Sequence, residues 1–292
     1  RGVKEVVNVD QAFLNSLDKH LETHRYDVVH SALPVHRCDV YHPHAGIEQI
    51  TLQSASIAQR MFNRRRKRFA HVEAAMLRDA APKVLCLSKR ARVALYNDME
   101  IDEEDLVTLY SAPDESRFVP RQDKAEHAIF IGQDFARKGL DIAIAAVALV
   151  DKLRLRVVGG DSQSAYDRLS GRVDFAGRRE NIAAELAKAI CLIHPARHEP
   201  FGMVIIEAML MGVPPIVSKK SGASEVVRDG VDGRVVDGED PKIWADAIRD
   251  VIARRDEMSR ACLARRDELS YGRHLDKLLS IYDRIVVARK HR

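Results

Sequence analysis

The first third of the chain carries two kinds of hydrophobic pattern. Apolar residues at Phe13, Leu14, Leu17 and Leu21 recur at the spacing of one helix face. Short apolar runs such as residues 84–87 are instead typical of buried strands. The pattern predicts helices over 10–24, 49–79 and 89–98, and strands over 27–30, 39–41, 84–87 and 107–109.

From residue 127 onward, strands alternate with helices. The pattern predicts strands over 127–131, 153–158, 173–175, 190–193, 214–217 and 233–236, helices over 139–150, 182–188, 202–211 and 223–228, and a charged helical region from 241. Such alternation predicts a parallel sheet with helices on both faces. Ligands of these sheets bind at the carboxyl ends of the strands, where Gly132, Gly159, Gly177 and His194 fall.

The polar, proline-containing stretch from Ser111 to Asp123 is expected to link two domains. The predicted fold class is α/β with two Rossmann-like domains. We expect a first domain over 1–113, a linker over 114–125, a second domain over 126–272, and a C-terminal helix over 273–292 that returns to the first domain.

Composition narrows the class of protein. The 292 residues suffice for two domains, and a net charge of +4 suits anionic ligands without requiring nucleic acid. Four widely spaced cysteines predict buried thiols rather than disulfides or metal ligands. No apolar run approaches the roughly 20 residues of a membrane span, and no signal peptide is recognisable. The chain starts at Arg1 without Met, which suggests a processed or truncated form.

A dense basic cluster, Arg60 to Arg68, holds six cations in nine residues. It fits a solvated helix face, or a face that contacts an anionic membrane or an anionic acceptor. Nucleic acid is the least favoured partner because aromatic residues make up only 5% of the chain.

The stretch from His194 to Val217 carries the most chemistry. Glu199 lies on a polar loop before a helix, and Glu207 lies inside that helix between apolar residues. The amides at such a helix N-terminus suit phosphate, and the carboxylates suit sugar hydroxyls or a developing positive charge. A pair of surface acids, or an acid and base pair of a hydrolase, stay as alternatives.

Arg137-Lys138-Gly139 lies on a strand-end loop just before a helix. Two cations and a glycine at this position can hold a diphosphate and neutralise its charge as it leaves. The alternative is a solvated pair of cations, although cations near a helix N-terminus oppose the helix dipole.

Three histidines, His30, His42 and His44, lie at strand ends of the first domain. The H-x-H spacing raises the possibility of a metal site, but a third strong ligand is missing nearby, so no metal is expected. Contact with a sugar or an acceptor is favoured for His44 over the other two.

These motifs resemble the retaining family 4 glycosyltransferases of the two-Rossmann, B-type fold. The resemblance rests on Glu199 and Glu207 with Phe201-Gly202 between them, the following A-M-x-x-G-x-P, and S-G-A-S-E-V-V at 221–227. The segments F-I-G-Q-D-F-A-R-K-G-L-D at 130–141 and D-V-Y-H-P-H-A-G at 39–46 are most similar to the branch that includes the lipopolysaccharide core heptose glucosyltransferase.

The resemblance implies a role for each site residue. Arg137 and Lys138 would hold the donor diphosphate in place of a metal, Glu207 would bind ribose, and Glu199 would contact the sugar ring. The remaining donor-binding positions implied are Gly132, the backbone of Phe201, Gly202, Met203 and Val204, and Gly177 and Arg178 beside the nucleobase. His44 matches only loosely a position that faces the sugar, and it is assigned with Glu199 to catalysis.

The resemblance also predicts the function. We expect a hexose, best glucose, to be transferred from UDP-glucose to a saccharide or glycolipid acceptor, with retained configuration and no cofactor. The first domain would be acceptor-side and the second donor-binding, at a cytoplasmic and peripheral membrane location. The first strand and glycine-rich loop typical of the family have no counterpart here, so the first domain is expected to lack its N-terminal strands. A non-catalytic sugar-nucleotide-binding or scaffold protein is the alternative, followed by an epimerase or a phosphorylase.

Overall fold

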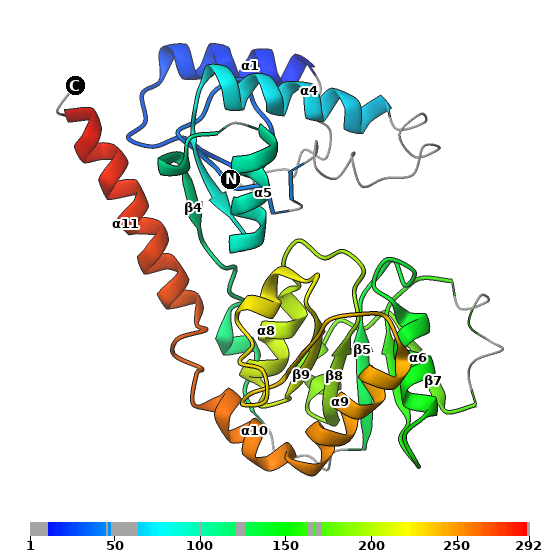
Figure 1. The fold of residues 1–292 in the computed structure, drawn as a ribbon. Coiled ribbons are helices and arrows are strands. Elements are labelled where there is room, and N and C mark those ends of the chain that lie inside the picture. Colours follow the sequence, from blue (N-terminus) through cyan, green and yellow to red (C-terminus); the bar gives the residue numbers. More distant parts are fainter. Residues whose placement is uncertain are drawn as a thin grey trace. The chain divides into compact units, whose positions relative to one another are not determined.

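A computed structural model describes residues 11–44, 46–47, 64–99, 101–120, 126–162, 166 and 171–290. The chain separates into two compact units (Figure 1). The first unit comprises residues 1–109 and 277–292, and the second comprises residues 110–276. The second unit therefore includes the last four residues of the predicted first domain, Tyr110 to Pro113.

The first unit contains a four-stranded parallel sheet in the order β1-β2-β3-β4. Its elements are α1 (Gln11–Thr23), β1 (His30–Ser31), β2 (Val40–Tyr41), α4 (Arg64–Asp79), β3 (Lys83–Cys86), α5 (Lys89–Met99), η1 (Glu103–Asp105), β4 (Leu106–Thr108) and most of α11 (Tyr271–Lys290). Successive side chains of a strand face opposite sides of a sheet. Val84 and Cys86 accordingly pack in one core cluster with α1, α4 and α5, whereas Leu85 packs with Ile281 of α11.

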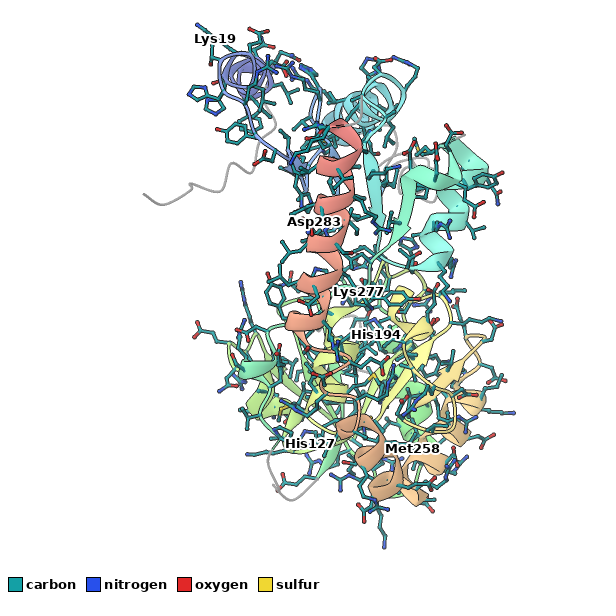
Figure 2. All side chains as sticks on the ribbon, turned by 90° about the vertical axis from the view of Figure 1, so that its left-hand side faces the viewer. Lys19, His127, His194, Met258, Lys277 and Asp283 are labelled. Atoms are coloured by element: carbon teal, nitrogen blue, oxygen red, sulfur yellow. The ribbon has the colours of Figure 1, made fainter. Side chains whose placement is uncertain are left out.

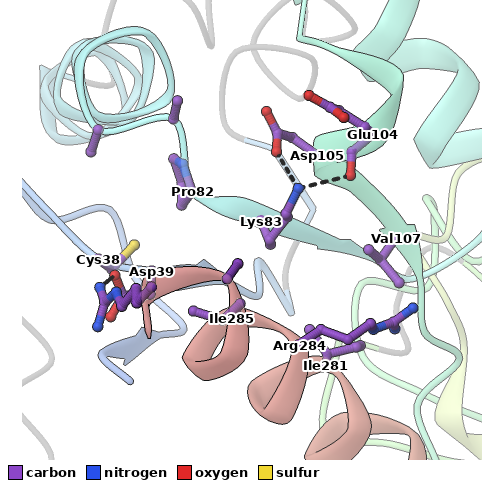
Figure 3. A pocket seen from close by; sticks show the side chains of 14 residues that line it. Cys38, Asp39, Pro82, Lys83, Glu104, Asp105, Val107, Ile281, Arg284 and Ile285 are labelled. Carbon is purple, nitrogen blue, oxygen red and sulfur yellow. Dashed lines mark hydrogen bonds and ion pairs between the residues drawn. The ribbon is translucent and has the colours of Figure 1, made fainter. Parts of the chain in front are cut away.

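A cavity of about 690 Å³ lies at the amino edge of this sheet (Figure 3). Lys83 at the start of β3 donates a hydrogen bond to Asp105 at 2.6 Å, and Ile281 and Ile285 of α11 form the apolar wall. His44 follows β2 and therefore lies at the opposite, carboxyl edge. The cavity is separate from the residues for which chemistry was predicted.

The second unit contains a six-stranded parallel sheet in the order β10-β9-β8-β5-β6-β7. Its elements are η2 (Glu115–Arg117), β5 (His127–Ile131), α6 (Leu140–Ala148), β6 (Leu155–Val158), β7 (Val173–Gly177), α7 (Ile182–Leu186), β8 (Ala189–His194), α8 (Met203–Leu210), β9 (Pro215–Ser218), η4 (Gly222–Glu225), β10 (Arg234–Val236), α9 (Pro241–Ala253) and α10 (Arg255–Leu263). The predicted α/β class with parallel sheets is confirmed.

Connections that run in opposite directions place helices on both faces of this sheet. The chain moves from β5 through α6 to β6, but from β8 through α8 to the strand on the other side, β9. Right-handed crossovers in opposite directions lie on opposite faces. One core cluster accordingly joins α6 and α9 to the sheet, whereas α8 contacts β8 and β9 without belonging to that cluster (Figure 1). The strand order reverses between β5 and β8.

One predicted element is wrong. The helix expected over 223–228 is instead a single 3-10 turn, η4. The amide of Gly222 donates to the carbonyl of Glu199 at 3.0 Å, and the amide of Ala223 bonds to the same neighbouring loop. Tertiary hydrogen bonds therefore replace the helical ladder that the local sequence favours.

The basic cluster lies mostly outside the described residues. Helix α4 is described from Arg64, and its side chains only from Lys67, which is exposed together with Arg68. Contact with a membrane surface stays a prediction. Within the described ranges, no helix combines the length and the apolar character needed to cross a bilayer.

The predicted burial of the cysteines is confirmed. All four, Cys38, Cys86, Cys191 and Cys262, are buried free thiols. Burial raises the pKa of Cys191 to about 12, so this thiol stays protonated and unreactive at neutral pH.

A buried carboxylate, Asp232, joins the turn before β10 to the segment that follows α10. Asp232 is fully buried and accepts hydrogen bonds from the Arg228 amide at 2.7 Å and from the Arg265 guanidinium at 3.0 Å. Arg265 is itself only 11% exposed. Glu268 also pairs with this guanidinium at 2.7 Å but is 62% exposed, so Asp232 is the buried partner of Arg265.

We predict that Asp232→Asn destabilises the second unit by about 3 kcal/mol, because it removes the buried carboxylate and leaves Arg265 paired only with the exposed Glu268. The protein has a single tryptophan, Trp244, which is buried in the core of this unit, so denaturant unfolding followed by its fluorescence reports this unit. Asp246→Asn removes a carboxylate that is 77% exposed and should change stability by no more than about 0.5 kcal/mol. Equal effects of the two substitutions would contradict the assignment.

Candidate functional site

The candidate site lies where the strand order of the second unit reverses. The loop after β5 carries Arg137 and Lys138, and the loop after β8 carries Glu199. Because β5 and β8 are neighbours and run parallel, these two loops meet at the carboxyl edge of the sheet. Figure 2 labels His127, which begins β5, and His194, which ends β8 at this edge. Such a reversal opens the crevice in which ligands of this fold bind.

Three of the predicted residues converge there. Lys138 Nζ lies 3.2 Å from Glu199 Oε2, and the Arg137 guanidinium lies 3.5 Å from the same oxygen. Glu199 is only 12% exposed. Burial alone would raise the pKa of Glu199, but His194, Lys138 and Arg137 together outweigh burial and lower this pKa to about 2. Glu199 is therefore a carboxylate at neutral pH.

Arg137 makes further contacts that orient its guanidinium. Its Nε donates to Asp134 at 2.9 Å, and its Nη1 donates to the carbonyl of His198 at 2.7 Å. Lys138 passes over Gly132, where an added Cβ would lie 2.4 Å from the lysine Cδ. A side chain at position 132 would therefore displace Lys138 from its path to the site.

Arg197 joins the two loops. Its amide donates to the carbonyl of Arg137 at 2.9 Å, and its guanidinium donates to the carbonyl of Ala136 at 2.7 Å. The same guanidinium binds Asp141 through two hydrogen bonds, at 2.9 and 2.7 Å. The loop that carries the cations is therefore held against the loop that carries Glu199.

A third segment supports the loop before α8. Ser221 Oγ donates to the carbonyl of Phe201 at 2.8 Å. Gly202 precedes the helix with φ +97°, a backbone conformation that residues with a Cβ rarely adopt. The first-turn amides of Met203 and Val204 have no acceptor within the helix and point out of its N-terminus. This terminus can therefore receive an anion.

Glu207 differs from Glu199. It lies in the second turn of α8 and is only partly exposed, and among the described residues no hydrogen bond or ion pair to its carboxylate is found. Burial raises the pKa of Glu207, and the more distant charges of Arg117 and Lys138 only partly offset that rise. A carboxylate in this state is expected to gain from hydrogen-bond donors brought by a ligand.

The remaining predicted residues are more spread out. Gly177 ends β7, and Arg178 follows it with an exposed side chain. Since β7 is two strands from β5, these residues lie at the same edge, on a strand about 10 Å from β5. This location suits contact with the far end of an extended ligand.

The histidines are located in the first unit. The rings of His42 and His44 are 4.1 Å apart, and those of His30 and His42 are 5.6 Å apart. Burial, and next the charge of His44, lower the pKa of His30. Among the described residues, His, Cys, Asp and Glu side chains form no group of three that could hold a metal ion.

Sequence reasoning missed two residues of the site. Arg197 resembles any other loop cation, and its contacts with Asp141 and Ala136 depend on the meeting of two loops. His194 was noticed only as the end of a strand, yet it is fully buried beside Glu199. A polar residue that ends an apolar strand and precedes a proline is the signal that could have indicated it.

Comparison with known sequences gives a family. The model of the family described as glycosyl transferases group 1 matches residues 112–266, which is more than half of the chain. The D-inositol 3-phosphate glycosyltransferase of Mycolicibacterium smegmatis is 29% identical over 223 residues, covering 63% of this chain and 51% of the relative. That of Mycobacterium marinum is 32% identical over 176 residues, covering 54% and 38%. The chain spans about half the length, or less, of these curated relatives.

Solved structures share the fold. WaaG, a glycosyltransferase involved in lipopolysaccharide biosynthesis, superposes with a TM-score of 0.71 at 20% identity, covering 91% of this chain and 81% of that one. Sucrose-phosphate synthase from Thermosynechococcus elongatus gives 0.77 at 20% identity, covering 98% and 82%, and Anabaena HepE in complex with UDP gives 0.73 at 19%, covering 93% and 82%. The expected two-Rossmann fold is confirmed. Because the family match also spans both site loops and α8, the chain belongs to the group 1 glycosyl transferases.

Proposed function

We propose that the chain belongs to a retaining glycosyltransferase that transfers a hexose from a nucleotide-diphosphate sugar to a saccharide or glycolipid acceptor. The observation that carries the proposal is the contact of Arg137 and Lys138 with Glu199, beside a helix whose second turn carries Glu207 in the opposite electrostatic state. Two neighbouring cations balance the Glu199 carboxylate. The Glu207 carboxylate has no hydrogen bond or ion pair among the described residues. This arrangement suits a ligand with both a diphosphate and hydroxyl groups.

In the proposed complex, Arg137 and Lys138 bind the diphosphate and neutralise the charge that grows as it leaves. The first-turn amides of α8 add donors at the same edge. Glu207 accepts hydrogen bonds from the ribose hydroxyls, and Glu199 lies beside the sugar ring. Arg178 and Gly177 are placed toward the nucleobase.

UDP-glucose is the donor that we propose. HepE has been solved with UDP and with UDP-glucose, and the relatives named above are D-inositol 3-phosphate glycosyltransferases, which supports a nucleotide-sugar donor. The similarity to WaaG and the motifs at 130–141 favour the lipopolysaccharide branch of family 4. His44 as a residue that faces the sugar, a cytoplasmic location and membrane contact through Arg60 to Arg68 are part of the same proposal.

A non-catalytic sugar-nucleotide-binding protein is the second candidate. It would use the same donor site and differ only in the absence of transfer. Incubation with radiolabelled sugar nucleotides and a panel of saccharide and glycolipid acceptors separates the two. Labelled product supports transfer. Donor binding without transfer or donor hydrolysis, in a form that spans the full length of the relatives, favours the second candidate.

Replacing both Arg137 and Lys138 by Ala should weaken UDP binding at least tenfold, about 1.4 kcal/mol, because the diphosphate loses both cations. Isothermal titration calorimetry measures the change. The matched control replaces Arg249 and Arg260, exposed cations of α9 and α10, and removes the same charge away from the two site loops. An unchanged affinity in the first variant would refute the assignment of the cations.

The change Glu207→Gln should weaken UDP binding about tenfold or more, because the ribose hydroxyls lose an ionised acceptor. Binding of inorganic pyrophosphate should stay the same. The ligand-free variant should also be more stable at pH 7, because a carboxylate whose folded-state pKa is raised destabilises the fold when ionised. That gain should shrink as the pH falls through the raised pKa. Loss of pyrophosphate binding together with UDP binding would place Glu207 at the phosphates instead.

A further inference from the structure

His194 occupies an unusual position for a histidine. It ends β8, its side chain is fully buried, and neither ring nitrogen has a hydrogen-bond partner within the described part of the chain. Its Nε2 lies 3.7 Å from Glu199 Oε2, just beyond hydrogen-bond length. Buried polar groups are almost always hydrogen-bonded, so this exception requires an explanation.

Glu199 explains this exception, because a bound diphosphate would use the same two cations that now balance the Glu199 carboxylate. In the ligand-free protein its carboxylate is balanced by Lys138 at 3.2 Å and by Arg137 at 3.5 Å. A bound diphosphate carries at least two negative charges and attracts the same two cations. Glu199 would then remain a largely buried carboxylate with His194 as its nearest remaining partner.

We propose that His194 is a positioning residue that takes up one proton when the donor binds and, as an imidazolium, becomes the counter-charge of Glu199. The inference rests on the proposed diphosphate site. The proton comes from solvent and binds the unprotonated ring nitrogen, and no covalent bond between heavy atoms forms or breaks. The Nε2–H then donates to Glu199 Oε2, which keeps that carboxylate ionised and oriented beside the sugar.

The surroundings of His194 support this sequence of events. The ionisable groups that face it are Glu199 from its own loop, and Lys138 and Arg137 from the loop after β5. In the ligand-free protein, burial lowers the pKa of His194 most, and the two cations lower it further, whereas Glu199 raises it. The ring is therefore neutral before binding. Drawing the cations toward a diphosphate removes part of the lowering and leaves the effect of Glu199.

Calorimetric titration with UDP at pH 8, in buffers of different ionisation enthalpy, measures the protons exchanged on binding. At this pH UDP is fully ionised, since the second pKa of a phosphate is about 6. The parent protein should take up a measurable fraction of a proton for each UDP bound. His194→Gln keeps a neutral donor near the position of Nε2, so it should bind UDP within a few fold at pH 8 and take up none.

The change Glu199→Gln is the second variant, because it removes the carboxylate charge that the His194 imidazolium would balance. It should also abolish proton uptake, and it gives the answer where His194→Gln does not fold. Uptake that persists in either folded variant, or a parent protein that binds UDP without uptake, overturns the role of His194 but leaves the diphosphate site intact. Failure of the parent protein to bind UDP overturns the proposed function, and this inference with it.

Discussion

A carboxylate that is almost enclosed and still ionised needs positive charge beside it, and Glu199 imposes this requirement on the second unit. Two cations from one loop and an imidazole from the end of β8 surround its Oε2 within 3.7 Å. The cations in turn need a fixed loop, because long side chains lose conformational freedom when they are held in one geometry. The contacts that hold the two loops together therefore also hold the cations beside Glu199.

The loops are held mainly by backbone contacts. Arg197 bonds to main-chain groups of residues 136 and 137, and the turn at 221–223 bonds to main-chain groups of residues 199 and 201. Hydrogen bonds to the backbone place a loop independently of the side chains that it carries. The cations and Glu199 are therefore in position before a ligand arrives, and less reorganisation is needed on binding.

Much of this fold could be predicted from the sequence, because the signals are local. The strand over 127–131 was predicted at its observed bounds, since a continuous apolar run ended by glycine has few other interpretations. The helix predicted over 223–228 is wrong because the amides of Gly222 and Ala223 bond to a loop more than twenty residues earlier in the chain. Likewise, Arg137 and Glu199 could be named from their motifs, but Arg197 and His194 acquire meaning only when β5 and β8 become neighbours.

The two glutamates of the site show how one helix and its preceding loop can hold opposite electrostatic states. Cations beside Glu199 lower its pKa, whereas burial with little compensation raises that of Glu207. Paired acids whose environments separate their pKa values usually serve different roles. Glu199 is balanced before a ligand binds, and it holds Arg137 and Lys138 beside one carboxylate oxygen. Because burial raises the pKa of Glu207, its ionised form costs folding free energy, and a ligand that brings hydrogen-bond donors would recover part of it. Recognition of hydroxyl groups at this position would then be a source of affinity.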